Sequence, residues 1–185
     1  MSSPLEKRIV ISPIGFQDND ALKLIRREVG TLFGCETQIL PVLENIDFAI
    51  DFKRNQYHST VILDKLAEQA PNDAFKILAI TESDLFIPIF TYVFGEAQLG
   101  GKACIISTYR LSQELPSMEW EEEFKARVVK EALHELGHTF KLTHCKERHC
   151  IMRYSRSIED VDNKSKDFCR YCRRLLDDEM EGIWV

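Results

Sequence analysis

The stretch from residue 134 to residue 152, HELGHTFKLTHCKERHCIM, constrains this chain more than any other part of its sequence. It begins with a His-Glu-x-x-His pattern in which His134 and His138 are four residues apart. On a helix, this spacing places both imidazoles on one face, about one turn apart, where they can bind the same zinc ion. Glu135 lies between them and can reach a water on that metal. Because His144 follows six residues later, the sequence predicts three protein ligands for one zinc.

The pentapeptide alone is weak evidence, since many such patterns arise by chance as two solvated histidines. Here it lies at the end of a predicted helix that begins at Ser117, with glutamates in its first turns, where the helix dipole favours negative charge. An apolar stripe marks the buried face of this helix: Trp120, Phe124, Val128, Ala132 and Leu136. Side chains on a buried helix are held rigidly, which favours a functional site.

Three protein ligands with an open fourth position are typical of catalytic zinc, whereas a structural zinc site is closed. A water at the open position has its pKa lowered toward about 7. Glu135 is the expected general base, which accepts the proton of this water and passes it to the leaving group.

The residues before this helix predict an α/β fold with a twisted, mixed sheet. The predicted strands are residues 7–12, 35–40, 75–80, 91–98 and 102–107, and the last two flank Gly100-Gly101 as a hairpin-like connection. The predicted helices begin with caps at Asp18 or Asn19 and at Ser59, and they run to Phe33 and to Ala70. A short extended piece is expected at residues 48–52, and a last helix at residues 166–180.

Six cysteines occur in the chain, and four of them fall in its last 41 residues with the spacing C-x4-C-x18-C-x2-C. We expect no secretion signal, so this grouping favours metal over disulfides. Thiolates suit a closed tetrahedral zinc, although four reduced core cysteines remain the alternative. Cys35 and Cys104 are expected in the core, His149 in solvent, and His58 has no assigned role. The predicted zinc ligands are Cys145, Cys150, Cys169 and Cys172.

The pattern H-E-x-x-H-x-x-G-x-x-H followed by a methionine resembles that of the metzincins, and here it spans His134 to His144 with Met152 after it. Cysteines directly after the third histidine and around the methionine, followed by a distant Cys-x-x-Cys, resemble the archaemetzincins within that clan. The segments Asp84-Leu85 through Phe94-Gly95 and Ser107-Thr-Tyr-Arg110 also look like this family. The resemblance covers about residues 75 to 172.

This resemblance implies a zincin fold, with a catalytic zinc on the histidines and a second, structural zinc on the four cysteines. Met152 would form an apolar floor beneath the catalytic metal without binding it. Tyr154 resembles the tyrosine that approaches the zinc or the oxyanion in astacin-like members, with an ordinary packed tyrosine as the alternative. The substrate would be an extended peptide along an antiparallel edge strand, for which residues 91–99 are the candidate.

One position departs from the pattern, because Lys141 stands where the family has glycine. That glycine ends the helix in a left-handed conformation, so that the chain carries the third histidine to the metal. Lysine in this conformation costs roughly 1 kcal/mol, which zinc binding can offset. The alternatives are a changed turn and a weaker third bond to the metal.

The net charge is −6, but residues 141–174 carry ten basic and five acidic side chains. A solvated basic face is the simplest interpretation, and attraction of acidic substrate segments or nucleic acid is the alternative. No apolar run reaches membrane-span length, so we expect a cytoplasmic location without membrane contact. We expect one domain, with residues 1–139 as its upper part and residues 140–185 as a lower, zinc-bound lobe.

The sequence thus favours a zinc metallopeptidase that hydrolyses peptide bonds, acting as an aminopeptidase or an endopeptidase, with two zinc ions per chain. The alternative is a zinc-stabilised module that binds protein or nucleic acid and has a degenerate peptidase site. Lys141 and the basic segment support this alternative, whereas Glu135 opposes it because a structural site needs no carboxylate there. Nucleic acid is therefore the less expected partner, and the sequence leaves the oligomeric state open.

Overall fold

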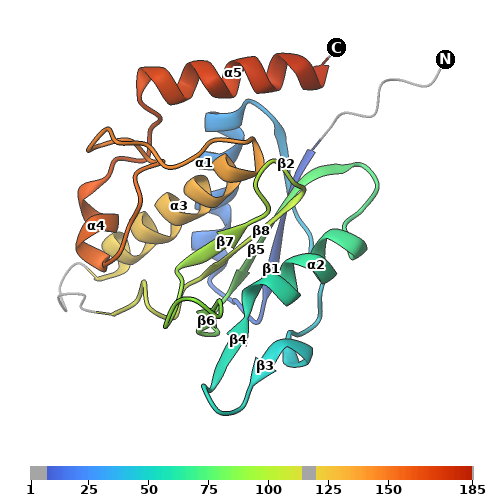
Figure 1. The fold of residues 1–185 in the computed structure, drawn as a ribbon. Coiled ribbons are helices and arrows are strands. Elements are labelled where there is room, and N and C mark those ends of the chain that lie inside the picture. Colours follow the sequence, from blue (N-terminus) through green and yellow to red (C-terminus); the bar gives the residue numbers. More distant parts are fainter. Residues whose placement is uncertain (1–7, 114–119, 185) are drawn as a thin grey trace.

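A five-stranded mixed sheet forms the centre of the computed structural model, which describes residues 8–113 and 120–184 (Figure 1). The strand order is β2-β1-β5-β8-β7. All neighbouring strands are parallel except β7, which pairs antiparallel with β8 at the edge. The strands are β1 (Arg8–Ile14), β2 (Glu36–Ile39), β5 (Ala74–Thr81), β7 (Gly95–Ala97) and β8 (Ala103–Ser107). This arrangement confirms the predicted α/β fold with a mixed sheet.

Helices cover both faces of the sheet, so its central strands are apolar on both sides. Ile9 and Ile11 of β1 pack into the same core as α1 (Asn19–Phe33) and α3 (Trp120–Thr139). Val10, between them in sequence, packs into a second core with α2 (Ser59–Gln69). The alternation follows from the two-residue period of a strand, which sends successive side chains to opposite faces.

The helix boundaries test the predicted caps. Asp18 accepts hydrogen bonds from the amides of residues 20 and 21, and Gly34 ends α1 with φ of 63°, as predicted. The predicted cap at Ser59 is wrong: His58 is the capping residue, and it makes no side-chain capping bond. The Ser59 hydroxyl instead donates to the Phe86 carbonyl and the Glu96 carboxylate. The predicted start of α3 at Ser117 lies outside the described residues.

A second, three-stranded sheet, which the sequence did not predict, has the order β3-β4-β6. It contains β3 (Ile50–Asp51), within the extended piece expected at residues 48–52, β4 (Gln56–His58) and β6 (Leu85–Phe86), and the short helix η1 (Asp47–Ala49) precedes it. The strand predicted at residues 91–98 is reduced to the three residues of β7. Side chains from β4 and the turn before it hold residues 90 and 91 instead, because Arg54 and Gln56 donate to their carbonyls.

The C-terminal part contains α4 (Ile158–Asn163), which was not predicted, and α5 (Arg170–Trp184), which begins four residues after the predicted start. Cys172 and Leu176 of α5 are buried in the core that also holds α1 and α3. Figure 1 shows α5 lying beyond these two helices, away from the sheet. Within the described ranges, no helix combines the length and hydropathy of a membrane span.

Candidate zinc centres and active-site cleft

The last turn of α3 and the segment after it bring three imidazoles to one point. One ligand nitrogen from each of His134, His138 and His144 lies within 4.8 Å of the other two. The Nε2 atoms of His134 and His138 are 3.1 Å apart, close enough for both to bind one ion. The structure therefore brings the three predicted histidine ligands together.

Backbone carbonyls fix which nitrogen is free in the first two of these imidazoles. His134 Nδ1 lies 2.8 Å from the Ile151 carbonyl oxygen, and His138 Nδ1 lies 2.7 Å from that of Leu142. Since a carbonyl can only accept, both Nδ1 atoms carry the proton, and both Nε2 atoms present a lone pair. Burial lowers the pKa of His138 to about 4 and that of His134 below its usual value as well. Both imidazoles are therefore neutral, which is the form that binds zinc.

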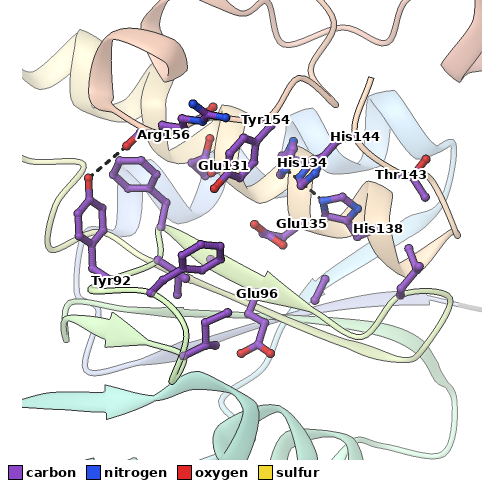
Figure 2. Close-up of a pocket in the computed structure, with 18 of the residues that line it drawn as sticks. Tyr92, Glu96, Glu131, His134, Glu135, His138, Thr143, His144, Tyr154 and Arg156 are labelled. Carbon is purple, nitrogen blue, oxygen red and sulfur yellow. Dashed lines mark hydrogen bonds between the residues drawn. The ribbon is translucent and has the colours of Figure 1, made fainter. Parts of the chain in front are cut away.

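Glu135 is buried beside the histidines and faces the strand β7 (Figure 2). Burial, and secondarily the Glu131 carboxylate, raise its pKa well above the usual value. Gly95 of β7 makes this placement possible, because a β-carbon there would lie 2.7 Å from Glu135 Cγ. The glycine at position 95 thus allows the backbone of β7 to approach Glu135 closely.

Met152 is fully buried. A β-carbon at Gly137 would lie 2.5 Å from its sulfur, so only glycine allows this contact. The Met152 carbonyl oxygen accepts a hydrogen bond from the Cys145 amide, 2.8 Å away. Met152 therefore joins the histidine helix to the cysteine segment, and the matching role of Gly137 was not predicted.

Lys141 adopts the left-handed conformation of the glycine that it replaces, with φ of 63°. Its amide donates to the His138 carbonyl, which ends the helix, and its ammonium pairs with Glu179 of α5 at 2.9 Å. The turn that carries the chain to His144 is therefore kept, and the changed turn considered above is wrong. Its side chain lies against Gly100, whose amide donates to the same His138 carbonyl.

The four C-terminal cysteines form a second cluster, with one sulfur from each lying within 4.8 Å of the others. None of the four forms a disulfide. Amides donate to the sulfurs of Cys145, Cys150 and Cys169 at 3.3–3.5 Å, and such bonds stabilise thiolates. His149 is exposed and lies outside this set, as expected, and Cys35 and Cys104 are buried in the core.

A cleft of about 500 Å³ runs between β7 and α3 and contains the histidine site. Its walls include the segment before β7 on one side and residues 154–156 on the other. The Tyr154 ring lies 4.8 Å from that of His144, between centroids, and is 39% exposed. The predicted tyrosine is thus at the site, next to the third histidine.

Ion pairs that the sequence analysis missed hold α4 against α3. Lys164 and Glu131 form a wholly buried pair at 2.6 Å, and Arg127 binds Asp162 through two bonds of 2.7 Å. Lys130 also donates to two carbonyls of α4. The spacing of residues 127, 130 and 131 along one helix face was the available signal, but their partners in and directly after α4 are 31 or more residues away in the sequence.

Comparison with known proteins agrees with this geometry. The sequence matches Peptidase family M54 over residues 19–178. It is 38% identical over 180 residues to the archaemetzincin of Methanocaldococcus jannaschii, covering 96% of each chain. The crystal structure of archaemetzincin from Methanopyrus kandleri is similar with a TM-score of 0.81 and 30% identity, covering 96% of this chain and 97% of that one.

A zinc-dependent peptidase from Methanocorpusculum labreanum is similar with a TM-score of 0.78 and 27% identity, covering 91% of this chain and 99% of that one. The family match spans most of the chain, and the two solved structures share the fold of this chain over 96% and 91% of its length. This chain therefore belongs to peptidase family M54, the archaemetzincins.

Proposed function

We propose that this zinc metallopeptidase holds its catalytic zinc on His134, His138 and His144 and uses Glu135 as the general base. The convergence of three lone-pair nitrogens beside a buried carboxylate carries the proposal. A zinc ion on such ligands activates water and polarises a carbonyl group. Glu135 faces the cleft, where it can take the proton of the attacking water and pass it to the departing amine.

The fit of this site to zinc rests on its donor set. Two imidazoles have their Nδ1 protons committed to carbonyls, so their Nε2 atoms have no role except as acceptors or ligands. Desolvation holds all three imidazoles below their usual pKa, which keeps them neutral. In this proposal, buried Met152 would form the apolar floor of the site, and Tyr154, whose ring lies 4.8 Å from that of His144, would stabilise negative charge on the substrate oxygen.

The four-cysteine cluster supports a second, structural zinc. Four converging sulfurs, three of which accept hydrogen bonds from backbone amides, match the donor set of a closed tetrahedral site. Because Cys145 follows His144 directly, such a site would hold the segment that carries the third catalytic ligand. Reduced thiols of this kind favour a cytosolic location. The core shared by α3 and α5 supports one domain with residues 140–185 as its lower lobe.

The peptide would lie in extended form along β7. Alternate β7 residues bond to β8, as the Gln98–Ala103 and Phe94–Ser107 bonds show. The amides and carbonyls of Gly95 and Ala97 therefore point away from β8, toward the free edge. A substrate strand can pair with them without any requirement on its sequence. The binding-module alternative is not favoured. The departure at Lys141 supported it, but Lys141 keeps the left-handed turn that carries the chain to His144.

The test is the variant Glu135→Gln, which keeps the shape of the side chain and removes its basicity. We expect kcat to fall about 10²- to 10⁴-fold on a mixed peptide library, the range of general acid–base catalysis. Zinc content, measured by atomic emission, should stay at two per chain. Cleavage that persists at the wild-type rate would exclude Glu135 as the base.

A further inference from the structure

Glu96 of β7 lines the cleft, yet neither the histidine site nor the proposed proton transfer uses it. Its neighbour Gly95 faces α3, since a β-carbon there would lie 2.7 Å from Glu135 Cγ. Because successive residues of a strand face opposite sides, the Glu96 side chain points to the other face of the sheet. Figure 2 shows its carboxylate on the side of β7 away from the three histidines. Glu96 therefore lies on the edge strand proposed above for the substrate, but on its far face.

Two hydroxyls at the start of α2 hold this carboxylate in place. Thr60 Oγ1 donates to Glu96 Oε1 at 2.8 Å, and Ser59 Oγ donates to Oε2. Both hydroxyls belong to the first turn of α2, where the helix dipole favours negative charge. A carboxylate has about four acceptor positions, so two hydroxyl donors leave room for another donor. Thr60 is exposed and Glu96 is partly exposed, so a group in the cleft can reach the remaining positions.

Three carboxylates line the cleft, and they differ in what balances their charge. Lys164 pairs with Glu131 at 2.6 Å, and Glu135 is the general base of the proposed mechanism. Within residues 8–113 and 120–184, no basic side chain lies within ion-pair distance of the Glu96 carboxylate, whose partners are the two hydroxyls. Glu96 therefore presents a fixed negative charge that a substrate can neutralise.

A peptide that pairs with the free edge of β7 places one residue directly beside Glu96. The side chains of directly paired residues lie on the same face of a sheet, whether the strands run parallel or antiparallel. The side chain beside Glu96 therefore shares its face, and the side chains of the two adjacent peptide residues lie on the face of Glu135. The direction of the peptide does not change this assignment.

We propose that Glu96 selects substrates that carry a lysine or arginine side chain at the position beside it. The inference rests on the substrate position proposed above and adds the chemical class of this side chain. An ammonium or guanidinium group supplies charged donors for the acceptor positions that the hydroxyls leave free. Opposite charges at directly paired positions of adjacent strands attract, and like charges repel. The peptidase thus favours a basic side chain and disfavours an acidic one at a single position.

Peptides that differ at one residue test this preference with the zinc-loaded enzyme. A peptide that the enzyme cleaves is acetylated at its N-terminus and amidated at its C-terminus, which removes both terminal charges. Lysine, norleucine or glutamate then replaces each residue in turn, with norleucine as the uncharged counterpart of lysine. At one position, we expect KM to be about three- to tenfold lower with lysine than with norleucine, and highest with glutamate. The two adjacent positions should show no such preference, because their side chains lie on the other face.

The variant Glu96→Gln keeps the length of the side chain and an oxygen for the hydroxyls of α2, but it removes the charge. KM should then be equal for the lysine and norleucine peptides, and zinc content should not change. Glu68→Gln is the matched control, because it removes an equal charge from an exposed pair with Lys65 on α2. Its preference for lysine should equal that of the wild type. Glu96→Lys reverses the charge and should favour glutamate over lysine at the same position.

Binding separates this proposal from the one on which it rests. The zinc-loaded Glu135→Gln variant should bind the lysine peptide about three- to tenfold more tightly than the norleucine peptide in fluorescence anisotropy. The double variant Glu96→Gln/Glu135→Gln should bind both equally. If the wild type cleaves no peptide but these affinities are found, the proposed chemistry fails and the Glu96 contact stands.

Three results would overturn the contact. The first is a preference for lysine that persists in Glu96→Gln, and the second is a preference of equal size at every peptide position. The third is a preference that appears only in peptides with a free N-terminus, because the carboxylate would then bind the terminal amine and not a side chain.

Discussion

The histidine site and the cysteine cluster are adjacent in sequence, yet they are built in opposite ways. The histidine site opens into a cleft, and its first two ligands come from one helix turn and are oriented by backbone carbonyls. The cysteine cluster draws its four sulfurs from two separate segments, and backbone amides point at them. One arrangement leaves a position for substrate, whereas the other joins pieces of chain that would otherwise be held by few contacts.

This difference teaches which site bears on activity and which on folding. The histidine helix packs into the core through Phe124, Val128, Ala132 and Leu136 of its predicted apolar stripe, so it does not depend on a metal to keep its place, whereas Trp120 at the start of the stripe is exposed. The segment from Cys145 to the start of α5 contains one short helix and much irregular chain. Metal binding supplies folding free energy where a preformed site is absent from the unfolded chain.

The largest expected effect comes from breaking the cysteine cluster. Cys172→Ser should lower the free energy of unfolding by about 3 kcal/mol or more. This is the stability that the protein loses when it can no longer bind an ion whose free concentration is over a hundred times its Kd. His144→Ala should abolish peptide cleavage but lower stability by less than about 1 kcal/mol, because its side chain is exposed. Urea unfolding and zinc analysis of both variants provide the measurement. Equal destabilisation would erase the distinction between the two sites.

Both clusters were predictable from the sequence because their ligands are close along the chain or follow a fixed spacing. His134 and His138 come together on any helix that contains both. The two cysteine pairs come together when the chain between them closes a single loop. The apolar strands and the helix caps at Asp18 and Gly34 are likewise local signals. Where the determinants are local, residue types and spacing are sufficient.

The walls of the cleft were not predictable, because long-range pairs make them. Asp84 meets Arg110, and Gln56 meets the Thr91 carbonyl, across 26 and 35 residues. These contacts replace the first part of the strand expected at residues 91–98. The Glu131–Lys164 pair similarly fixes α4, whose six residues carry too weak a periodicity to be recognised. The shape of the cleft walls thus depends on tertiary contacts between residues far apart in the sequence, which residue spacing does not predict.

A smaller effect tests the link between the two sites through the packing of Met152 beneath the helix. Gly137→Ala places a β-carbon against the Met152 sulfur, so it should destabilise the protein by about 1–3 kcal/mol. It should also weaken zinc binding at the histidines, since the floor must shift.

The double variant Gly137→Ala/Met152→Ala distinguishes overpacking from helix propensity. If the clash is the cause, the double variant should be less destabilised than the sum of the single variants by at least about 0.5 kcal/mol in a thermodynamic cycle. Strict additivity of the two changes would mean that the contact between them carries no energy, and that Met152 does not couple the sites.

The smallest expected effect concerns Lys141, which lies in the turn between His138 and His144. Lys141→Gly should stabilise the protein by about 1 kcal/mol relative to Lys141→Ala, because only glycine adopts φ of 63° without strain. Both variants lose the ion pair with Glu179, a half-exposed contact worth about 0–1 kcal/mol. The difference between them therefore measures only the cost of the left-handed backbone conformation at residue 141. Thermal unfolding of the metal-loaded variants measures the difference. If the two are equally stable, the turn is imposed by the zinc-bound His144 and not by the residue at position 141.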